Sequence, residues 1–390
     1  MLALSNFRAR RPRHRATQLE TLEWLAQAHT RAEAGLVAQQ GKSFDNAAFL
    51  EWMRRRLRRF GCSSEQITTR GYEIDDCSHV DWRDMEVYDL SERPNGAGMR
   101  ARSKVFGRVA NAAFDELFTE VDSAPQHLIH VTCTGYESPS AAQMLVARKG
   151  WGRETRVTHA YHMGCYAALP ALRTAAGFCS YHDSGERSRP SRVDIVHTEL
   201  CSLHMHPLRH DPEQLVVQSL FADGCISYSV SAGGRAAAGG PALAVVSMDE
   251  WIVPDSANSM AWFCADFGME MVLARDVPEK ITASLSGFVS SLLAKAGQPE
   301  AALESALFAI HPGGPKIVDQ IAATLKLSEA QIAFSRAVLR EHGNMSSATL
   351  PHIWQRIVEA PEVTTDQLVV SLAFGPGLTL SGAVLRKVWP

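Results

Sequence analysis

Cys165 is the residue of this sequence best placed to act as a nucleophile. It follows Gly164 where a strand-like stretch gives way to the alanine-rich, helix-like stretch 165–176. A cysteine at the N-terminal end of a helix lies at the positive end of the helix dipole, which favours the thiolate form. A thiolate is the nucleophile in cysteine-dependent acyl transfer. The segment alone is nevertheless also typical of a buried structural cysteine.

Two later residues could complete a catalytic set with this cysteine. His311 stands at the end of an apolar strand-like stretch and precedes the rigid turn Pro312-Gly-Gly-Pro315. Asn344 stands between two helix-like stretches in the segment His342-Gly-Asn344-Met-Ser-Ser. Taken alone, each is more often a loop histidine or a capping asparagine. Together with Cys165 they would supply a nucleophile, a base and an amide donor.

Six sequence blocks resemble, in order and spacing, the signature blocks of the chalcone and stilbene synthase-like type III polyketide synthases. They are GCYAALPALR, LFADG, DVPEKI, HPGGPKIVDQ, GNMSSA and FGPGL. The resemblance extends from about residue 125 to 390 and is weaker before that. It implies an α/β protein with the thiolase fold, five layers (αβαβα) in two similar halves, and a homodimer. We therefore expect an N-terminal half, 1–240, with the cysteine and a C-terminal half, 241–390, with the histidine and asparagine.

The resemblance also implies a mechanism. The Cys165 thiolate attacks an acyl thioester and carries the growing chain, and His311 keeps this thiolate ionised through an ion-pair-like contact. His311 and Asn344 then donate hydrogen bonds to a thioester carbonyl, which stabilises the enolate formed when a malonyl unit loses CO₂. The expected substrates are an acyl-CoA starter and malonyl-CoA. No metal or redox cofactor is expected, because coenzyme A or a carrier arm brings the thioester.

The same resemblance assigns the residues around the reacting centre. Phe221 matches the family's gatekeeper phenylalanine, and Met271 stands where the family has a second gate phenylalanine. Trp262 replaces a glycine of the plant enzymes, and its indole should narrow the cavity. These departures favour the bacterial branch that makes pyrones or resorcinols from aliphatic starters. The implied substrate pocket comprises Cys133, Glu199, Cys201, His204, Trp262 and Ser346.

A cluster of arginines lies where the family keeps basic residues for coenzyme A. The residues concerned are Arg55, Arg58 and Arg59, within the run 54–59. Guanidinium groups suit phosphate because their planar donors can make two parallel hydrogen bonds. The alternative interpretation is a helix face that is simply solvated.

Three other functions compete with this interpretation. A papain-like cysteine hydrolase also uses Cys, His and Asn in this order, and His311 follows Cys165 within its typical spacing of roughly 130–150 residues. The local signature of that class is absent. The segment Glu199 to His210 holds cysteine and histidine side chains that could bind a metal, but no second ligand pair completes a structural site. A stand-alone ketosynthase acting on chains bound to an acyl carrier protein would use the same three catalytic residues.

Composition narrows the class of protein. The chain has 390 residues, of which 46% are apolar and 21% charged, with a formal net charge of −3. This balance gives no basic field for nucleic acid, and no apolar run approaches the roughly 18 residues of a membrane span. The N-terminus has no secretory signal pattern. Its eight cysteines form no C-x-x-C pair, which predicts free thiols and a cytoplasmic protein.

The elements that would position these residues alternate between strands and helices. This alternation predicts stacked α/β layers. Residues 1–16 are rich in arginine and are expected to form a mobile arm. Thr17 with Glu20 predicts a capped helix start, as does Ser328 with Gln331. The expected strands are 127–131, 156–159, 192–198, 225–231, 242–253, 307–310, 369–374 and 378–388, and helices are expected at 103–120, 140–149, 165–176, 212–221 and 316–325.

Overall fold

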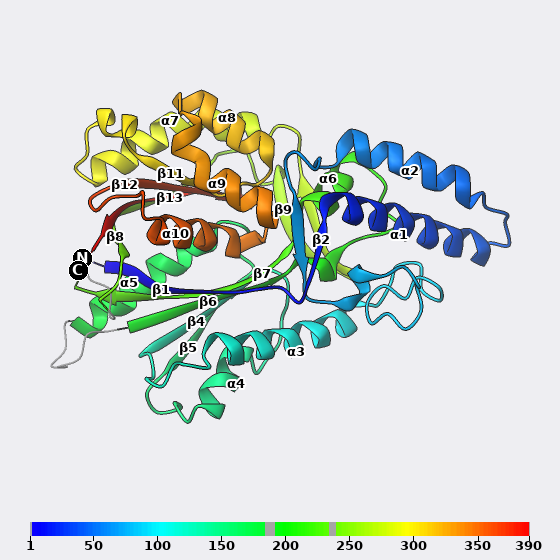
Figure 1. Cartoon of the computed structure of the whole chain (residues 1–390), viewed down its shortest axis with the longest axis horizontal. Helices are drawn as coiled ribbons and strands as arrows, with labels where there is room; N and C mark the ends of the chain where they lie inside the picture. The colour runs from blue at the N-terminus through cyan, green and yellow to red at the C-terminus, as the bar shows by residue number, and fades with distance from the viewer. Residues whose placement is uncertain (1, 184–191, 234–238, 390) are drawn as a thin grey trace.

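The computed structural model describes residues 2–183, 192–233 and 239–389 (Figure 1). Within them, nine strands form one continuous sheet in the order β11-β12-β13-β8-β1-β7-β6-β4-β5. The strands are β1 (Leu2–Arg10), β4 (His127–Thr132), β5 (Arg156–Tyr161), β6 (Arg192–Leu200), β7 (Asp223–Ala232), β8 (Ala242–Ile252), β11 (Leu307–Ile310), β12 (Leu368–Gly375) and β13 (Thr379–Val388). Two further pairs are β2 (His14–Thr17) with β3 (Thr69–Tyr72) and β9 (Met260–Ala265) with β10 (Gly268–Leu273).

The sheet is built from two similar halves. In the N-terminal half β4 is parallel to β6, β6 is antiparallel to β7, and β7 is antiparallel to β1. In the C-terminal half β11, β12, β13 and β8 follow one another with the same directions. The halves join where β1 pairs antiparallel with β8, with Ala3 opposite Ala244. The predicted repeat of two similar halves is thereby confirmed, whereas the division of the chain at residue 240 stays a prediction.

In the described part of the chain, three large hydrophobic cores separate five layers. The first core packs α1, α3 and α4 against the N-terminal half of the sheet. The central core joins α5 and α10 to strands of both halves, and the third packs α7 and α8 against the C-terminal half. Figure 1 shows α10 between the two halves, with α7 to α9 above and α3 and α4 below. The helices are α1 (Gln18–Gln39), α2 (Asn46–Phe60), α3 (Met99–Leu117), α4 (Ala141–Arg148), α5 (Ala168–Asp183), α6 (Pro212–Leu220), α7 (Val277–Lys295), α8 (Pro315–Leu325), α9 (Glu329–His342) and α10 (Thr349–Glu359).

The N-terminal residues correct one expectation. The mobile basic arm predicted for residues 1–16 is wrong, because β1 runs through the middle of the sheet and β2 pairs with β3. Leu4 is fully buried, and the guanidinium of Arg10 is buried between the carboxylates of Glu73 and Glu116. The two carboxylates, which are far from Arg10 in the sequence, offset the cost of burying its positive charge.

Local signals in the sequence place several helix starts correctly. Thr17 and Glu20 form a capping box at the start of α1, and Ser328 and Gln331 form one at the start of α9. Gly343 ends α9 with a φ of 73°, a backbone conformation that favours glycine. Among the residues described, no helix is long and apolar enough to cross a membrane.

Candidate active site

Cys165 lies on a tight turn between β5 and α5. The turn closes with a hydrogen bond from Ala167 N to Gly164 O at 3.1 Å. Gly164 has a φ of 80°, and a Cβ there would lie 2.5 Å from Cδ of Pro376. A side chain at this position would therefore be strained and would collide with the neighbouring loop. The helix begins at Ala168 and not at Cys165, so the cysteine precedes the helix that was expected to start with it.

His311 and Asn344 reach the same region from the C-terminal half. His311 follows β11, and its backbone N donates to Leu372 O at 2.8 Å. Asn344 forms an isolated β-bridge with Phe221 at the end of α6. Its side-chain Oδ1 accepts a hydrogen bond from Ser346 N at 2.8 Å, which fixes the orientation of the amide.

The catalytic candidates carry buried nitrogens that have no hydrogen-bond partner. Among the described residues, none bonds to either ring nitrogen of His311 or to Nδ2 of Asn344, although both side chains are buried. Unpartnered buried polar groups are rare and costly. These nitrogens line the same cavity as Cys165. They can therefore donate to an oxygen atom placed beside the cysteine sulfur.

The charge states differ from those expected for an ion pair. Burial raises the pKa of the Cys165 thiol to about 12, although the neighbouring Ser346 and Asn344 side chains oppose this shift. Burial lowers the pKa of His311 to about 3. Desolvation is the largest cause of both shifts, and these pKa values correspond to a neutral thiol and a neutral imidazole at pH 7. The ion pair of Cys165 and His311 stays a prediction.

Cys165 lies where two cavities meet. An outer cavity opens toward α2 and α8 and includes Arg59, Lys316 and His311. An inner cavity extends behind it and has a largely apolar lining. Both cavities are lined by Cys165 and by the two expected gate residues, Phe221 and Met271. The gate residues therefore lie at the junction, as the resemblance implied.

Five of the six expected pocket residues line the inner cavity; they are Cys133, Cys201, His204, Trp262 and Ser346. The indole of Trp262 is half-buried, and its Nε1 donates to Cys133 O at 2.7 Å. Glu199 lies behind the wall instead, where its carboxylate accepts hydrogen bonds from Cys133 N, Thr134 and Ser347. Burial raises the pKa of Glu199. This carboxylate supports the backbone of the wall and does not face the cavity.

The side chains of the alternative metal site have protein partners. His204 donates from Nε2 to Thr134 O at 2.8 Å and accepts at Nδ1 from Met269 N at 3.0 Å. His206 donates from Nε2 to Met269 O at 2.9 Å. Both oxygens of Glu199 also accept hydrogen bonds from the protein. These side chains are thus engaged in holding the protein together.

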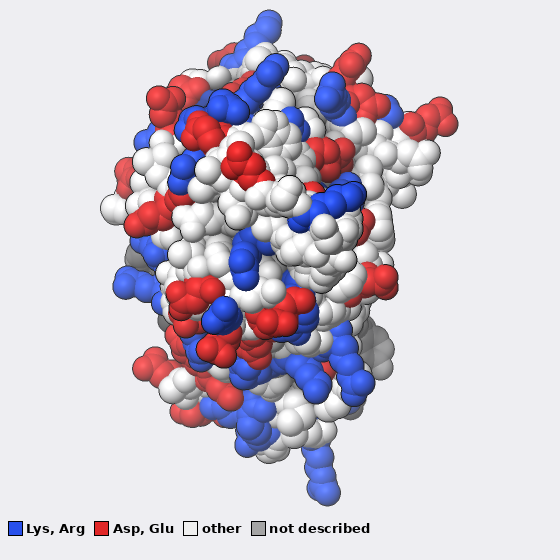
Figure 2. Space-filling model, turned by 90° about the vertical axis from the view of Figure 1, so that its right-hand side faces the viewer, with Lys and Arg blue, Asp and Glu red and all other residues white. Residues whose placement is uncertain are grey.

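Only one of the three arginines expected to bind coenzyme A lines a cavity. Arg59 lines the outer cavity, whereas Arg55 and Arg58 lie beside Glu51 at 3.8 and 3.3 Å on the exposed face of α2. On the side of the molecule shown in Figure 2, basic and acidic side chains are interspersed. Sequence reasoning missed Arg275 and Lys316, which line the outer cavity with Arg59. Lys316 lies in the HPGGPKIVDQ block, so its position next to His311 was the available signal.

Comparison with known proteins agrees with this arrangement. Residues 101–234 match the family described as chalcone and stilbene synthases, N-terminal domain, and residues 244–389 match the C-terminal domain of the same family. Type III polyketide synthase C of Arabidopsis thaliana is 29% identical over 266 residues, 67% of either chain. Type III polyketide synthase 21 of Oryza sativa subsp. japonica is 29% identical over 265 residues, 67% of this chain and 66% of the relative.

Solved structures show the same fold. PKS-I of the brown alga Ectocarpus siliculosus superposes with a TM-score of 0.82 at 21% identity, covering 99% of this chain and 98% of the other. The 1,3,6,8-tetrahydroxynaphthalene synthase of Streptomyces coelicolor A3(2) superposes with a TM-score of 0.79 at 21% identity over 100% of both chains. The five-layered thiolase fold expected from the sequence is confirmed.

Proposed function

Because this chain belongs to the chalcone and stilbene synthase family and is a condensing enzyme of the type III polyketide synthase kind, we propose that Cys165, His311 and Asn344 perform its chemistry. The observation that carries this proposal is the set of unpartnered buried nitrogens on His311 and Asn344, which line one cavity with the Cys165 thiol. A nucleophile beside two free donors suits acyl transfer, in which negative charge develops on a carbonyl oxygen.

Loading begins with the thiol of Cys165. His311 accepts the thiol proton on a ring nitrogen while the sulfur attacks the carbonyl carbon of an acyl-CoA. Asn344 Nδ2 donates to the oxyanion of the tetrahedral intermediate, because its Oδ1 is held by Ser346 N. The intermediate collapses, the bond to the sulfur of coenzyme A breaks, and that sulfur takes up the proton. The acyl chain is then a thioester of Cys165.

Extension uses the same donors. Malonyl-CoA places its thioester oxygen against His311 and Asn344, and the bond to its carboxylate breaks to release CO₂. The electron pair left on carbon forms an enolate, whose oxygen the two nitrogens stabilise. The enolate carbon attacks the acyl-Cys165 carbonyl, a carbon–carbon bond forms, and the cysteine leaves as thiolate.

The two cavities suit different parts of the substrate. Members of the family use coenzyme A thioesters, and the cations of Arg59, Arg275 and Lys316 at the outer cavity suit their phosphates. The inner cavity is lined by Met205, Met260, Met269 and Met271 with Val217, and these flexible apolar side chains suit an unbranched acyl chain. This lining supports aliphatic starters and a pyrone or resorcinol-type product. The homodimer, the carrier-protein alternative and the cytoplasmic location stay predictions.

The test is incubation with acyl-CoA starters of increasing length and malonyl-CoA, with product masses as the measurement. Products that contain the starter and added two-carbon units are expected. A parallel incubation with acyl-carrier-protein thioesters separates the iterative synthase from the stand-alone ketosynthase. Absence of any condensed product from either donor would refute the proposal.

A further inference from the structure

The gate residue Met271 lies on β10 of the two-stranded sheet formed by β9 and β10. Side chains from another segment cover the free edge of β10. β10 pairs antiparallel with β9, so that Met271 lies opposite Trp262. In an antiparallel pair, every second residue turns its backbone N–H and C=O away from the partner strand. Met269, Met271 and Leu273 are the residues that do so in β10, because their backbone groups bond to side chains of residues 204–214. A two-stranded ribbon is marginally stable by itself, so these contacts determine where it lies.

The two ends of this edge are held differently. Met269 is fixed twice, by His204 at its N–H and by His206 at its C=O. Both histidines are buried, and burial lowers the pKa of each, which keeps His204 able to accept at Nδ1. Met269 precedes the gate residue Met271 by two residues in β10. Met269 is therefore the fixed point of β10.

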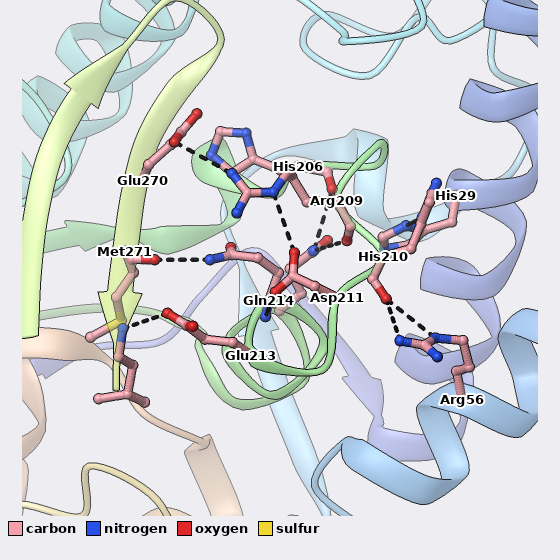
Figure 3. Close-up of polar contacts among 12 residues, drawn as sticks. His29, Arg56, His206, Arg209, His210, Asp211, Glu213, Gln214, Glu270 and Met271 are labelled. Carbon is pink, nitrogen blue, oxygen red and sulfur yellow. Dashed lines mark hydrogen bonds and ion pairs between the residues drawn. The ribbon is translucent and has the colours of Figure 1, made fainter. Parts of the chain in front are cut away.

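The end at the gate is held by the first turn of α6. Gln214 Nε2 donates to Met271 O at 2.8 Å, and Glu213 Oε1 accepts from Leu273 N, as Figure 3 shows. The Gln214 side chain is buried, with 3% of its surface exposed, so water does not readily replace this bond. Residues 213 and 214 thus connect α6 to the backbone of the gate residue Met271 and of Leu273, two residues further on.

α6 links the two gate residues to each other. It runs from Pro212 to Leu220, about 13 Å at the rise of an α-helix, and Phe221 is its C-cap residue. The carbonyl of Phe221 accepts a hydrogen bond from the buried Arg70 at 2.7 Å. One short helix therefore carries Phe221 at its end and holds Met271 from its start.

The start of α6 is itself anchored. Asp211 caps the helix by accepting from Gln214 N at 3.1 Å. The preceding residue, His210, accepts at its carbonyl from Arg56 of α2 at 2.8 Å (Figure 3). Its ring contacts Glu33 at 3.1 Å and His29 at 2.9 Å. These contacts make the base of the helix rigid. A displacement of β10 must then break its bonds to residues 213 and 214.

We propose that Gln214 and Glu213 are positioning residues that latch β10 to α6, and that this latch sets the acyl chain length by holding Met271 at the cavity junction. The inference rests on the proposed function, since Met271 is a gate only if a chain bound to Cys165 enters the inner cavity. Without the latch, β10 pivots about Met269 and the junction widens. Longer chains then pass more readily.

The test compares wild type with Gln214→Met, which keeps the side-chain length and removes the donor. Turnover is measured with hexanoyl-, decanoyl- and palmitoyl-CoA, each with malonyl-CoA. We expect kcat/KM for palmitoyl-CoA relative to hexanoyl-CoA to rise about fivefold, the population shift that loss of one ordinary hydrogen bond gives. The kcat for hexanoyl-CoA should change less than about twofold, because Cys165 is untouched. A folded variant with the wild-type length preference overturns the latch.

Further variants separate positioning from general loss of stability. Glu213→Leu removes the second contact and should shift the preference in the same direction, which keeps the test decisive if Gln214→Met does not fold. Glu213→Gln retains an acceptor for Leu273 N and should behave as wild type. Gln331→Met is the control for stability, because Gln331 Nε2 also donates to backbone carbonyls, of Leu303 and Ala306, away from both cavities. This substitution also removes the capping contact of Gln331 with Ser328 N, so it should cost at least as much stability as Gln214→Met.

Two control results bear directly on the interpretation. An equal shift in Gln331→Met overturns the latch, because the effect would then be one of stability alone. Intact-protein mass after incubation with hexanoyl-CoA reports loading of Cys165. Absence of this adduct from wild type refutes the proposed function and the latch with it. An adduct on wild type together with an unchanged length preference in Gln214→Met refutes the latch alone.

Discussion

Asn344→Asp is the substitution that isolates the donor role proposed for Asn344. Aspartate has nearly the same size, and its oxygen can still accept from Ser346 N, now at 2.8 Å, and from Thr349 Oγ1, now at 3.4 Å. The Nδ2 donor is lost, and a carboxylate takes its place. Asn344→Ala removes that donor and also leaves the buried Ser346 N without its partner, which costs about 1–3 kcal/mol of folding stability.

The expected magnitude follows from the number of donors. In the proposed mechanism Asn344 supplies one of the two side-chain donors to the enolate, and loss of one such donor slows the reaction by about 10²–10³, or about 2.7–4 kcal/mol. The aspartate carboxylate would also repel the enolate, so the reaction should be slowed by at least this factor. Loading of Cys165 should still reach completion at long times, because the thiol remains.

The assay is the rate of CO₂ release from malonyl-CoA, with intact-protein mass as the control for loading. Asn344→Asp should be slow, and Asn344→Ala should be slow and less stable by about 1–3 kcal/mol. CO₂ release by Asn344→Asp at close to the wild-type rate would refute the reasoning. The unpartnered nitrogen would then have a different purpose.

Three further outcomes are expected. Cys165→Ala should keep the fold and lose the single acyl adduct, and an adduct that persists would refute the nucleophile. The rate of Cys165 alkylation by iodoacetamide should rise about tenfold per pH unit from pH 7 to 10, because burial raises the thiol pKa to about 12; a plateau below pH 7 would contradict this. Trp262→Gly should admit longer starters and lose up to about 3 kcal/mol of stability, since the indole is only half-buried; an unchanged product profile in a folded, active variant would show that Trp262 does not limit chain length.

Much of the layered fold could be predicted because each strand and helix carries its own local pattern. Every residue of the strand His127–Thr132 is buried, and the helix ends carry capping signals. The N-terminal strand could not be recognised in this way. Its arginines are typical of a solvated arm, and the partners of Arg10, Glu73 and Glu116, are distant in sequence. Only the folded chain brings these charges together.

The ribbon of β9 and β10 was also missed, for a related reason. The free edge of β10 is hydrogen-bonded by side chains of residues 204–214 and not by a third strand. The sequence therefore contains no further strand whose pattern would indicate a sheet here. The family resemblance still placed Trp262 and Met271 at the cavity, because aligned positions can be assigned without knowing the local structure. It also placed Glu199 in the pocket, although this side chain bonds behind the wall. The resemblance identifies the residues around the cavity, and the hydrogen bonds of the structure show which of their side chains face it.

The order of the two pKa values constrains how the thiol of Cys165 becomes reactive. An ion pair requires a thiol that is more acidic than the imidazole, and here burial shifts the pKa of Cys165 up and that of His311 down. The charged forms can persist only if the two side chains come into contact, so that each charge offsets the desolvation of the other. Neither ring nitrogen of His311 has a partner among the described residues, so this imidazole is free to make that contact or to receive the thiol proton during attack. The second route makes proton transfer part of loading, whereas each condensation expels the thiolate directly. Loading is then the step that burial slows, because it must begin from the neutral thiol.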